Sequence, residues 1–163
     1  MAKKKPNPSK SEPTIENRRA RHDYTIAETL EVGVALRGTE VKSVRAGRVS
    51  LNEGFVMASA QPGGAVGLTL HQVSIGEYAP GGSQQHRLDR VRMLLAHRRE
   101  IVRLARQLEV KGATIVPLKL YFKGGRVKIL LGIGTGRAEY DKRRAIAERE
   151  SKRELQRLMS RRR

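Results

Sequence analysis

Residues 114–134 read TIVPLKLYFKGGRVKILLGIG, and this stretch decides the fold. Two apolar runs flank Gly124 and Gly125, a pair of glycines suited to the positive φ angles of a tight hairpin turn. The stretch therefore predicts two antiparallel strands joined by a short turn. The glycines at 134 and 136 are expected to loosen the backbone where the chain leaves the folded body.

Shorter patterns precede this hairpin. VGVAL (32–36) alternates apolar residues as a half-buried strand does, while GFVMASA (54–60) and GLTLHQVSI (67–75) predict a second hairpin. GTEVKSVRAG (38–47) predicts a short helix with Thr39 as N-cap and Gly47 as terminator. A longer helix is expected where apolar residues recur at three- and four-residue intervals, at Val91, Leu94, Leu95, Ile101, Val102, Ala105 and Leu108.

These elements predict a mainly β fold with helices. There is no alternating βαβ rhythm, and about six antiparallel strands usually close on themselves to remove exposed edges. A small antiparallel barrel is therefore favoured, with an open sheet as the alternative. A chain of 163 residues suits one core with appendages. We divide it into a disordered basic arm (1–16), a body (17–136) and a C-terminal tail (137–163).

The charge of the chain narrows the choice of partner. The formal net charge is +18, from 34 basic and 16 acidic residues, so a polyanion is expected, with nucleic acid as the first candidate. An acidic membrane surface is the rival, but no stretch approaches the roughly 20 apolar residues that span a bilayer. We therefore expect a soluble cytoplasmic protein without membrane association. Cysteine is absent, which excludes disulfides and cysteine-based zinc sites.

No catalytic or metal-binding pattern stands out. The third glycine position of a dinucleotide motif starting at GIGTG (132–136) falls on Arg137, and no Walker loop or nucleophile elbow occurs. His22 and Asp23 would point to opposite faces if they lay in a strand. We therefore expect neither an enzyme nor a cofactor. The histidines are too scattered for a metal site: His22, His71, His86 and His97.

Five stretches together resemble one family. They are NRRARHDYTI (17–26), GTEVKSVRAGR (38–48), LLAHRREI (94–101), VPLKLYFKGGRVKI (116–129) and YDKRRAIAERE (140–150). In this order they resemble the SmpB family of SsrA-binding proteins, which act in bacterial trans-translation. The resemblance implies an oligonucleotide-binding (OB) fold that grips the tRNA-like domain of transfer-messenger RNA (tmRNA), and a tail that enters ribosomes lacking messenger RNA.

The resemblance also implies a surface that binds RNA, and three residues of this surface have an alternative interpretation. Asn17 could instead cap a first turn, and Leu95 could be a core residue of the long helix. Glu31 would accept hydrogen bonds from base amino groups or sugar hydroxyls, or else pair with a nearby arginine. The implied RNA-binding residues are Asn17, Arg19, Arg21, His22, Glu31, Lys42, Arg45, Arg48, Leu95, Arg98 and Lys123.

The tail carries a second set of implied contacts. Its thin apolar stripe and dense charge predict disorder in the free protein and a helix of about 33 Å on the ribosome. The implied partners are tmRNA, the ribosome with its small-subunit rRNA, and elongation factor Tu through the charged tmRNA complex, with the protein as a monomer. The implied tail residues are Arg137, Tyr140, Asp141, Lys142, Arg143, Ile146, Arg149, Lys152, Arg153, Leu158 and Met159.

Two other function classes stay open. A general single-strand RNA-binding or ribosomal structural protein would have the same charge, and an RNA-processing enzyme is a further possibility. The chain has only four Tyr, two Phe and no Trp, too few for a broad base-stacking platform. This scarcity favours recognition of the shape and backbone of a folded RNA.

Overall fold

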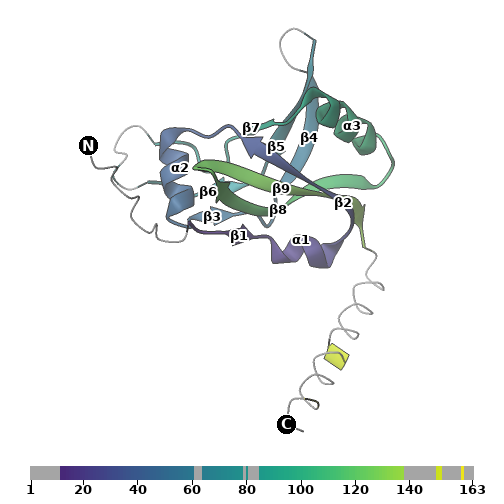
Figure 1. Cartoon of the computed structure of the whole chain (residues 1–163), viewed down its shortest axis with the longest axis horizontal. Coiled ribbons are helices and arrows are strands. Elements are labelled where there is room, and N and C mark those ends of the chain that lie inside the picture. The colour runs from purple at the N-terminus through teal and green to yellow at the C-terminus, as the bar shows by residue number, and fades with distance from the viewer. Residues whose placement is uncertain are drawn as a thin grey trace, which may run out of the picture.

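A computed structural model describes residues 12–60, 64–78, 80, 85–137, 150–151 and 159. The body is a strongly curved antiparallel sheet with three helices around it (Figure 1). In chain order, the described elements are β1 (Ile15–Glu16), α1 (Arg18–Asp23), β2 (Tyr24–Val34), α2 (Gly38–Arg45), β3 (Val49–Ser50), β4 (Phe55–Ala60), β5 (Val66–His71), β6 (Ser74–Ile75), β7 (Arg92–Leu95), α3 (Arg98–Leu108), β8 (Ala113–Lys123) and β9 (Arg126–Gly136).

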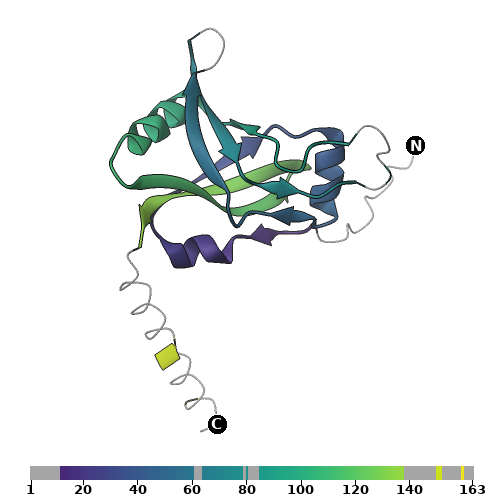
Figure 2. The same cartoon turned by 180° about the vertical axis from the view of Figure 1, so that it is seen from behind.

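The strands pair around a ring. The larger sheet has the order β1-β8-β4-β5-β7-β2-β9, and β9 also pairs with β8. One link is thin, since β4 meets β8 only at Val56 and Ile115. The predicted mainly β fold with helices is confirmed, and the predicted closure is present in part as this ring. Figure 2 shows the reverse side, with α2 and α3 at opposite ends.

The hairpin that decides the fold is confirmed. β8 and β9 pair from Ala113 opposite Thr135 to Lys123 opposite Arg126. Gly124 and Gly125 form the turn with φ angles of 58° and 72°, a region that side chains with a Cβ disfavour. β9 continues along β2 as well, so this one strand holds two neighbours together.

Apolar side chains from the ring and the helices fill one core. Leu68, Leu70 and Ile115 lie inside it, and Leu104 of α3 is fully buried against them. Val44 attaches α2 in the same way. Burial of each such side chain contributes about 1.5–3 kcal/mol, which stabilises the fold without disulfides.

The predicted long helix is wrong in its first half. Residues 92–95 form strand β7, in which Arg92 and Leu94 are buried while Met93 and Leu95 are exposed. The helix begins only at Arg98. A short alternating strand followed directly by an amphipathic helix imitates the three- and four-residue spacing of one continuous helix.

Several boundaries also differ from the predictions. The cap of α2 is Arg37 rather than Thr39, because the Glu40 carboxylate accepts a hydrogen bond from the Arg37 N–H at 2.6 Å. Strand 32–36 is the end of the longer β2, which stops at Val34. Residues 15–16, which the prediction placed in a disordered arm, instead pair with β8.

The glycines near the end of β9 do not loosen the chain. β9 remains a strand through Gly136, and Gly134 lies opposite Ile26 of β2. A Cβ on Gly134 would lie only 2.0 Å from the Thr25 carbonyl oxygen. Gly134 therefore allows two backbones to approach closely at the bulge in β2.

Candidate nucleic-acid interface

Glu31 lies at the centre of a polar clamp on the outer side of the ring. Its carboxylate accepts a short hydrogen bond from the Tyr121 hydroxyl, and Lys123 Nζ donates to both carboxylate oxygens at 3.0 and 3.1 Å. Three bonds use most of the roughly four lone-pair sites of a carboxylate. One of the two predictions for Glu31 is that it pairs with a nearby arginine. Glu31 does pair with neighbouring side chains, but these are Lys123 and Tyr121.

The clamp fixes the charge states of its members. The Tyr121 hydrogen bond, followed by the Lys123 ammonium, lowers the pKa of Glu31, so its carboxylate is ionised at neutral pH. Burial, followed by the Glu31 carboxylate, raises the pKa of Tyr121 to about 12. The tyrosine therefore stays a hydrogen-bond donor, and Lys123 is held beside it.

Leu95 lies exposed beside this clamp. It is 55% exposed at the end of β7, opposite Gly33 of β2. A Cβ on Gly33 would lie 3.2 Å from the Leu95 Cβ, so the missing side chain gives Leu95 room to lie across β2. The prediction that Leu95 belongs to a helix core is wrong. The strand pattern of β7 turns this residue outward.

A shallow hollow joins Glu31 to Leu95. It has a volume of about 620 Å³, and Met93, His97 and Lys128 also line it. Lys128 of β9 lies opposite Gly33 of β2 and opposite Tyr121 of β8, so these three residues form a line across three neighbouring strands. An apolar surface between lysines can hold a base or ribose while the ammonium groups meet phosphates.

Sequence reasoning missed some of these residues. Gly33, Met93, Tyr121 and Lys128 were not singled out as site residues. Lys119, Tyr121 and Lys123 alternate along β8, and this period of two was the available signal for one polar face.

Helix α2 brings a basic group to the same end of the molecule. The Lys42 ammonium lies 4.9 Å from the centre of the Tyr78 ring, and the Arg45 guanidinium lies 5.3 Å from that of Phe122. Arg48 donates to the Glu77 carbonyl at 3.0 Å. Phe122 lies between Tyr121 and Lys123 in β8, so the structure places Arg45 of α2 near the end of β8 that carries Lys123.

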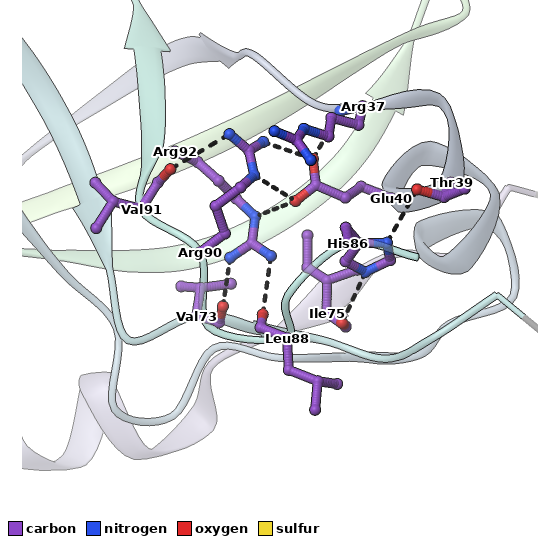
Figure 3. Close-up of polar contacts among 10 residues, drawn as sticks. All are labelled: Arg37, Thr39, Glu40, Val73, Ile75, His86, Leu88, Arg90, Val91 and Arg92. Carbon is purple, nitrogen blue, oxygen red and sulfur yellow. Dashed lines mark hydrogen bonds and ion pairs between the residues drawn. The ribbon is translucent and has the colours of Figure 1, made fainter. Parts of the chain in front are cut away.

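A buried ion network holds α2 in place (Figure 3). Glu40 and Arg92 are both 0% exposed, and Arg92 Nε donates to the Glu40 carboxylate at 2.9 Å. Arg90 adds a second ion pair to Glu40 at 2.7 Å. Burial alone would raise the pKa of Glu40, but hydrogen bonds from Arg90 and Arg37, with the Arg92 charge, keep it below its usual 4.5. These contacts fix the helix that carries Lys42 and Arg45.

A buried histidine forms a second link under α2. His86 Nε2 lies 3.0 Å from the Ile75 carbonyl oxygen, which can only accept, so this nitrogen carries the proton. His86 Nδ1 lies 3.0 Å from the Thr39 hydroxyl. Thr39 therefore attaches the first turn of α2 to the loop before β7 rather than capping the helix.

The predicted residues of α1 form a separate group. Asn17 is 2% exposed and caps α1, and its amide donates to the Leu51 and Pro117 carbonyls at 2.8 and 3.0 Å. Its expected place on the RNA surface is therefore wrong, because the side chain points inward and is bonded on all sides. The capping alternative is confirmed.

The charges of α1 are partly neutralised. Arg19 pairs with Asp23 at 3.3 Å and with Glu53 at 2.7 Å. His22 Nδ1 lies 3.0 Å from Asp23 Oδ1, so the two side chains contact each other directly. The expectation that they point to opposite faces is wrong, because they lie at the end of a helix and not in a strand. Arg21 is exposed. Arg18 is exposed as well, so both arginines are accessible to an RNA phosphate.

The two groups lie far apart. Seven strand residues separate the end of α1 from Glu31, which corresponds to about 23 Å along β2.

The start of the tail is attached beside α1. The Arg137 N–H donates to the Asp23 carbonyl at 2.8 Å, and Arg137 Nε donates to the Thr25 hydroxyl at 3.1 Å. Met159 is exposed. The other predicted tail residues lie outside the described residues: Tyr140, Asp141, Lys142, Arg143, Ile146, Arg149, Lys152, Arg153 and Leu158.

The described residues contain neither a metal-site cluster nor a membrane-spanning helix. Across 12–60, 64–78, 80, 85–137, 150–151 and 159, no three His, Cys, Asp or Glu side chains gather as a metal site would require. Within the same ranges, no helix is long and apolar enough to cross a membrane.

Comparisons with known proteins identify the family of this chain. The family model described as SmpB protein matches residues 14–161. The chain belongs to the SmpB family. An SsrA-binding protein of Thermobifida fusca is 49% identical over 162 residues, covering 99% of this chain and 98% of the relative. One from Lactobacillus helveticus is 49% identical over 142 residues, covering 87% and 90%.

A solved structure shares the fold as well. It is described as "tmRNA-SmpB: a journey to the center of the bacterial ribosome", and it is 44% identical with a TM-score of 0.63. The match covers 82% of this chain and 94% of the other. Of the five SmpB-like stretches, four lie within described elements: α1 with the start of β2, α2, the end of β7 with α3, and the β8–β9 hairpin.

Proposed function

We propose that this protein binds the tRNA-like domain of tmRNA and delivers it to stalled ribosomes for trans-translation. The observation that carries the proposal is the 44% identical structural match to a chain of a tmRNA-SmpB structure, over 82% of this chain. The SsrA-binding relatives, alike over nearly the whole chain, point the same way. In this role the protein catalyses no reaction and requires no cofactor.

The outer side of the ring is the proposed recognition face. Leu95 offers an apolar surface, Lys128 lines the same hollow, and Lys123 is bonded to Glu31 in that hollow. Lys42 and Arg45 extend the positive surface over α2. Such a face supports recognition of a folded RNA by its backbone and sugar edges.

We assign the tail a separate task. Residues 137–163 probe the empty mRNA channel and order themselves there, since contacts with rRNA phosphates offset the entropy of folding. The protein acts as a cytoplasmic monomer, and elongation factor Tu joins it through the charged tmRNA. The OB-fold description of the body belongs to this proposal too.

Truncation separates the two tasks. A protein ending at Arg137 should bind the tRNA-like RNA within about twofold of the full chain, because none of the face residues is removed. The same protein should fail to support peptide tagging on stalled ribosomes. Equal loss of both activities would refute the division, and equal affinity for an unstructured RNA of the same length would refute tmRNA recognition.

A further inference from the structure

Helix α3 presents a second row of positive charge. Leu104 is fully buried, and Ile101 and Leu108 pack against the core. At 100° per residue, the opposite side of the helix carries four arginines and one valine. All five are exposed: Arg98, Arg99, Val102, Arg103 and Arg106.

The row is only slightly neutralised. Arg103 pairs with Glu28 at 2.8 Å. Glu100 is turned to the start of the helix, where its carboxylate accepts from the His97 N–H at 2.9 Å. Among the described residues, no acidic partner is present for Arg99 or Arg106. Like charges three and four residues apart destabilise a helix slightly, so this row lowers the stability of α3 unless an anion binds to it.

The later part of the row lies away from the proposed recognition face, whose hollow reaches α3 at Glu100 and Ile101 in its first turn. Glu28 follows the inward side of β2, together with Leu30 and Val32, whereas Glu31 and Gly33 belong to the outward side. The ion pair with Glu28 therefore places the middle of α3 over an end of the ring. Figure 1 shows α3 at the end opposite to α2.

We propose that Arg99, Arg103 and Arg106 bind the phosphate backbone of a second RNA, which is ribosomal RNA rather than tmRNA. This proposal rests on the proposed function. Along the helix axis the three residues are about 6 and 4.5 Å apart. One sugar–phosphate strand passing along the helix can meet all three. The hollow of the recognition face reaches only the first turn of α3, so Arg103 and Arg106 are left for a second contact.

The test compares two doubly substituted proteins. In Arg99→Gln/Arg106→Gln the row loses two charges but keeps the Arg103–Glu28 pair. In the control, Arg87→Gln/Arg126→Gln, the same charge is lost from exposed positions in the loop before β7 and at the start of β9. Each protein is titrated with purified ribosomes and, separately, with the isolated tRNA-like domain of tmRNA, at several salt concentrations.

The expected result is selective. Loss of two phosphate contacts lowers the salt slope for ribosome binding by about 1.4–1.8, a loss of roughly thirtyfold in affinity at 0.1 M salt. Affinity for the tRNA-like domain should change less than about twofold. The control pair should leave the ribosome slope within about 0.5 of the unsubstituted value.

Three outcomes would overturn the proposal. They are an equal loss of tRNA-like domain binding, no change in ribosome binding, or an equal effect of the control pair. None of them touches the proposed function, which is judged on tmRNA recognition by the unsubstituted protein. Should the Gln pair unfold, Arg99→Glu/Arg106→Glu replaces it, with Arg99→Lys/Arg106→Lys expected to retain the ribosome affinity.

Discussion

The buried Glu40–Arg92 pair provides a sharp test of how the interface is supported. Glu40→Gln removes one charge and leaves the Arg92 guanidinium buried without its counterion. Both side chains are 0% exposed, so water cannot replace the lost partner. We expect α2 and the strand start at Arg92 to lose stability together.

The size of the effect follows from the contacts. Removing one member of a buried ion pair typically costs about 3–5 kcal/mol. Arg92 still donates to the Val73 and Leu88 carbonyls at 2.5 and 2.9 Å, which favours the lower end. The expected loss is therefore about 3 kcal/mol, or about 6–12 °C in Tm for a chain of this length.

The assay is urea unfolding followed by far-UV circular dichroism, because the chain has no tryptophan. Arg92→Met and the double variant complete a cycle, with an expected coupling of about 1–3 kcal/mol. Glu53→Gln is the matched control: its pair with Arg19 is exposed, 66% and 62% for the two side chains, so it should cost less than about 1 kcal/mol. A loss below about 1 kcal/mol for Glu40→Gln, or additive single effects, would refute the reasoning.

Three further predictions concern other parts of the fold. The difference in free energy of unfolding between wild type and Glu40→Gln should have its full value above pH 4.5 and shrink below it, because the folded-state pKa of Glu40 lies below its usual 4.5. Urea midpoints across pH 3–6 measure this difference, and a constant difference would contradict the prediction. Gly134→Ala should lower Tm more than Gly132→Ala, since a Cβ at 134 would lie 2.0 Å from the Thr25 carbonyl oxygen, whereas a Cβ at 132 would meet only side-chain atoms, of Leu118 at 2.8 Å and of Ile26 at 3.1 Å; equal Tm values would show that the backbones can separate. Glu31→Gln should weaken tmRNA binding about tenfold although it adds positive charge, and tighter binding in a filter assay would argue against the clamp.

Much of the fold could be predicted from local patterns. Gly124 and Gly125 marked the β8–β9 turn because only glycine adopts such φ angles readily. The second hairpin, β4–β5, also followed from alternation and turn residues. These features depend on neighbours in sequence, so the sequence carries them.

What could not be predicted depends on distant contacts. Arg92 lies within the stretch predicted as one long helix, yet it is buried in a strand because Glu40, 52 residues away, neutralises it. Asn17 looked available to RNA, but its amide is consumed by carbonyls 34 and 100 residues away. The Glu31–Tyr121 bond joins residues 90 apart. Pairings of this kind exist only once the ring has formed.

The central claim is that the outer face around Glu31 and Leu95 selects a folded tRNA-like RNA. Sequencing the RNA that co-purifies with the protein from bacterial cells, for wild type and for Leu95→Ala/Lys123→Gln, tests it most directly. The account predicts strong enrichment of tmRNA with wild type and its loss with the double variant, while both remain folded. Unselective RNA with wild type, or undiminished tmRNA with the variant, would contradict it.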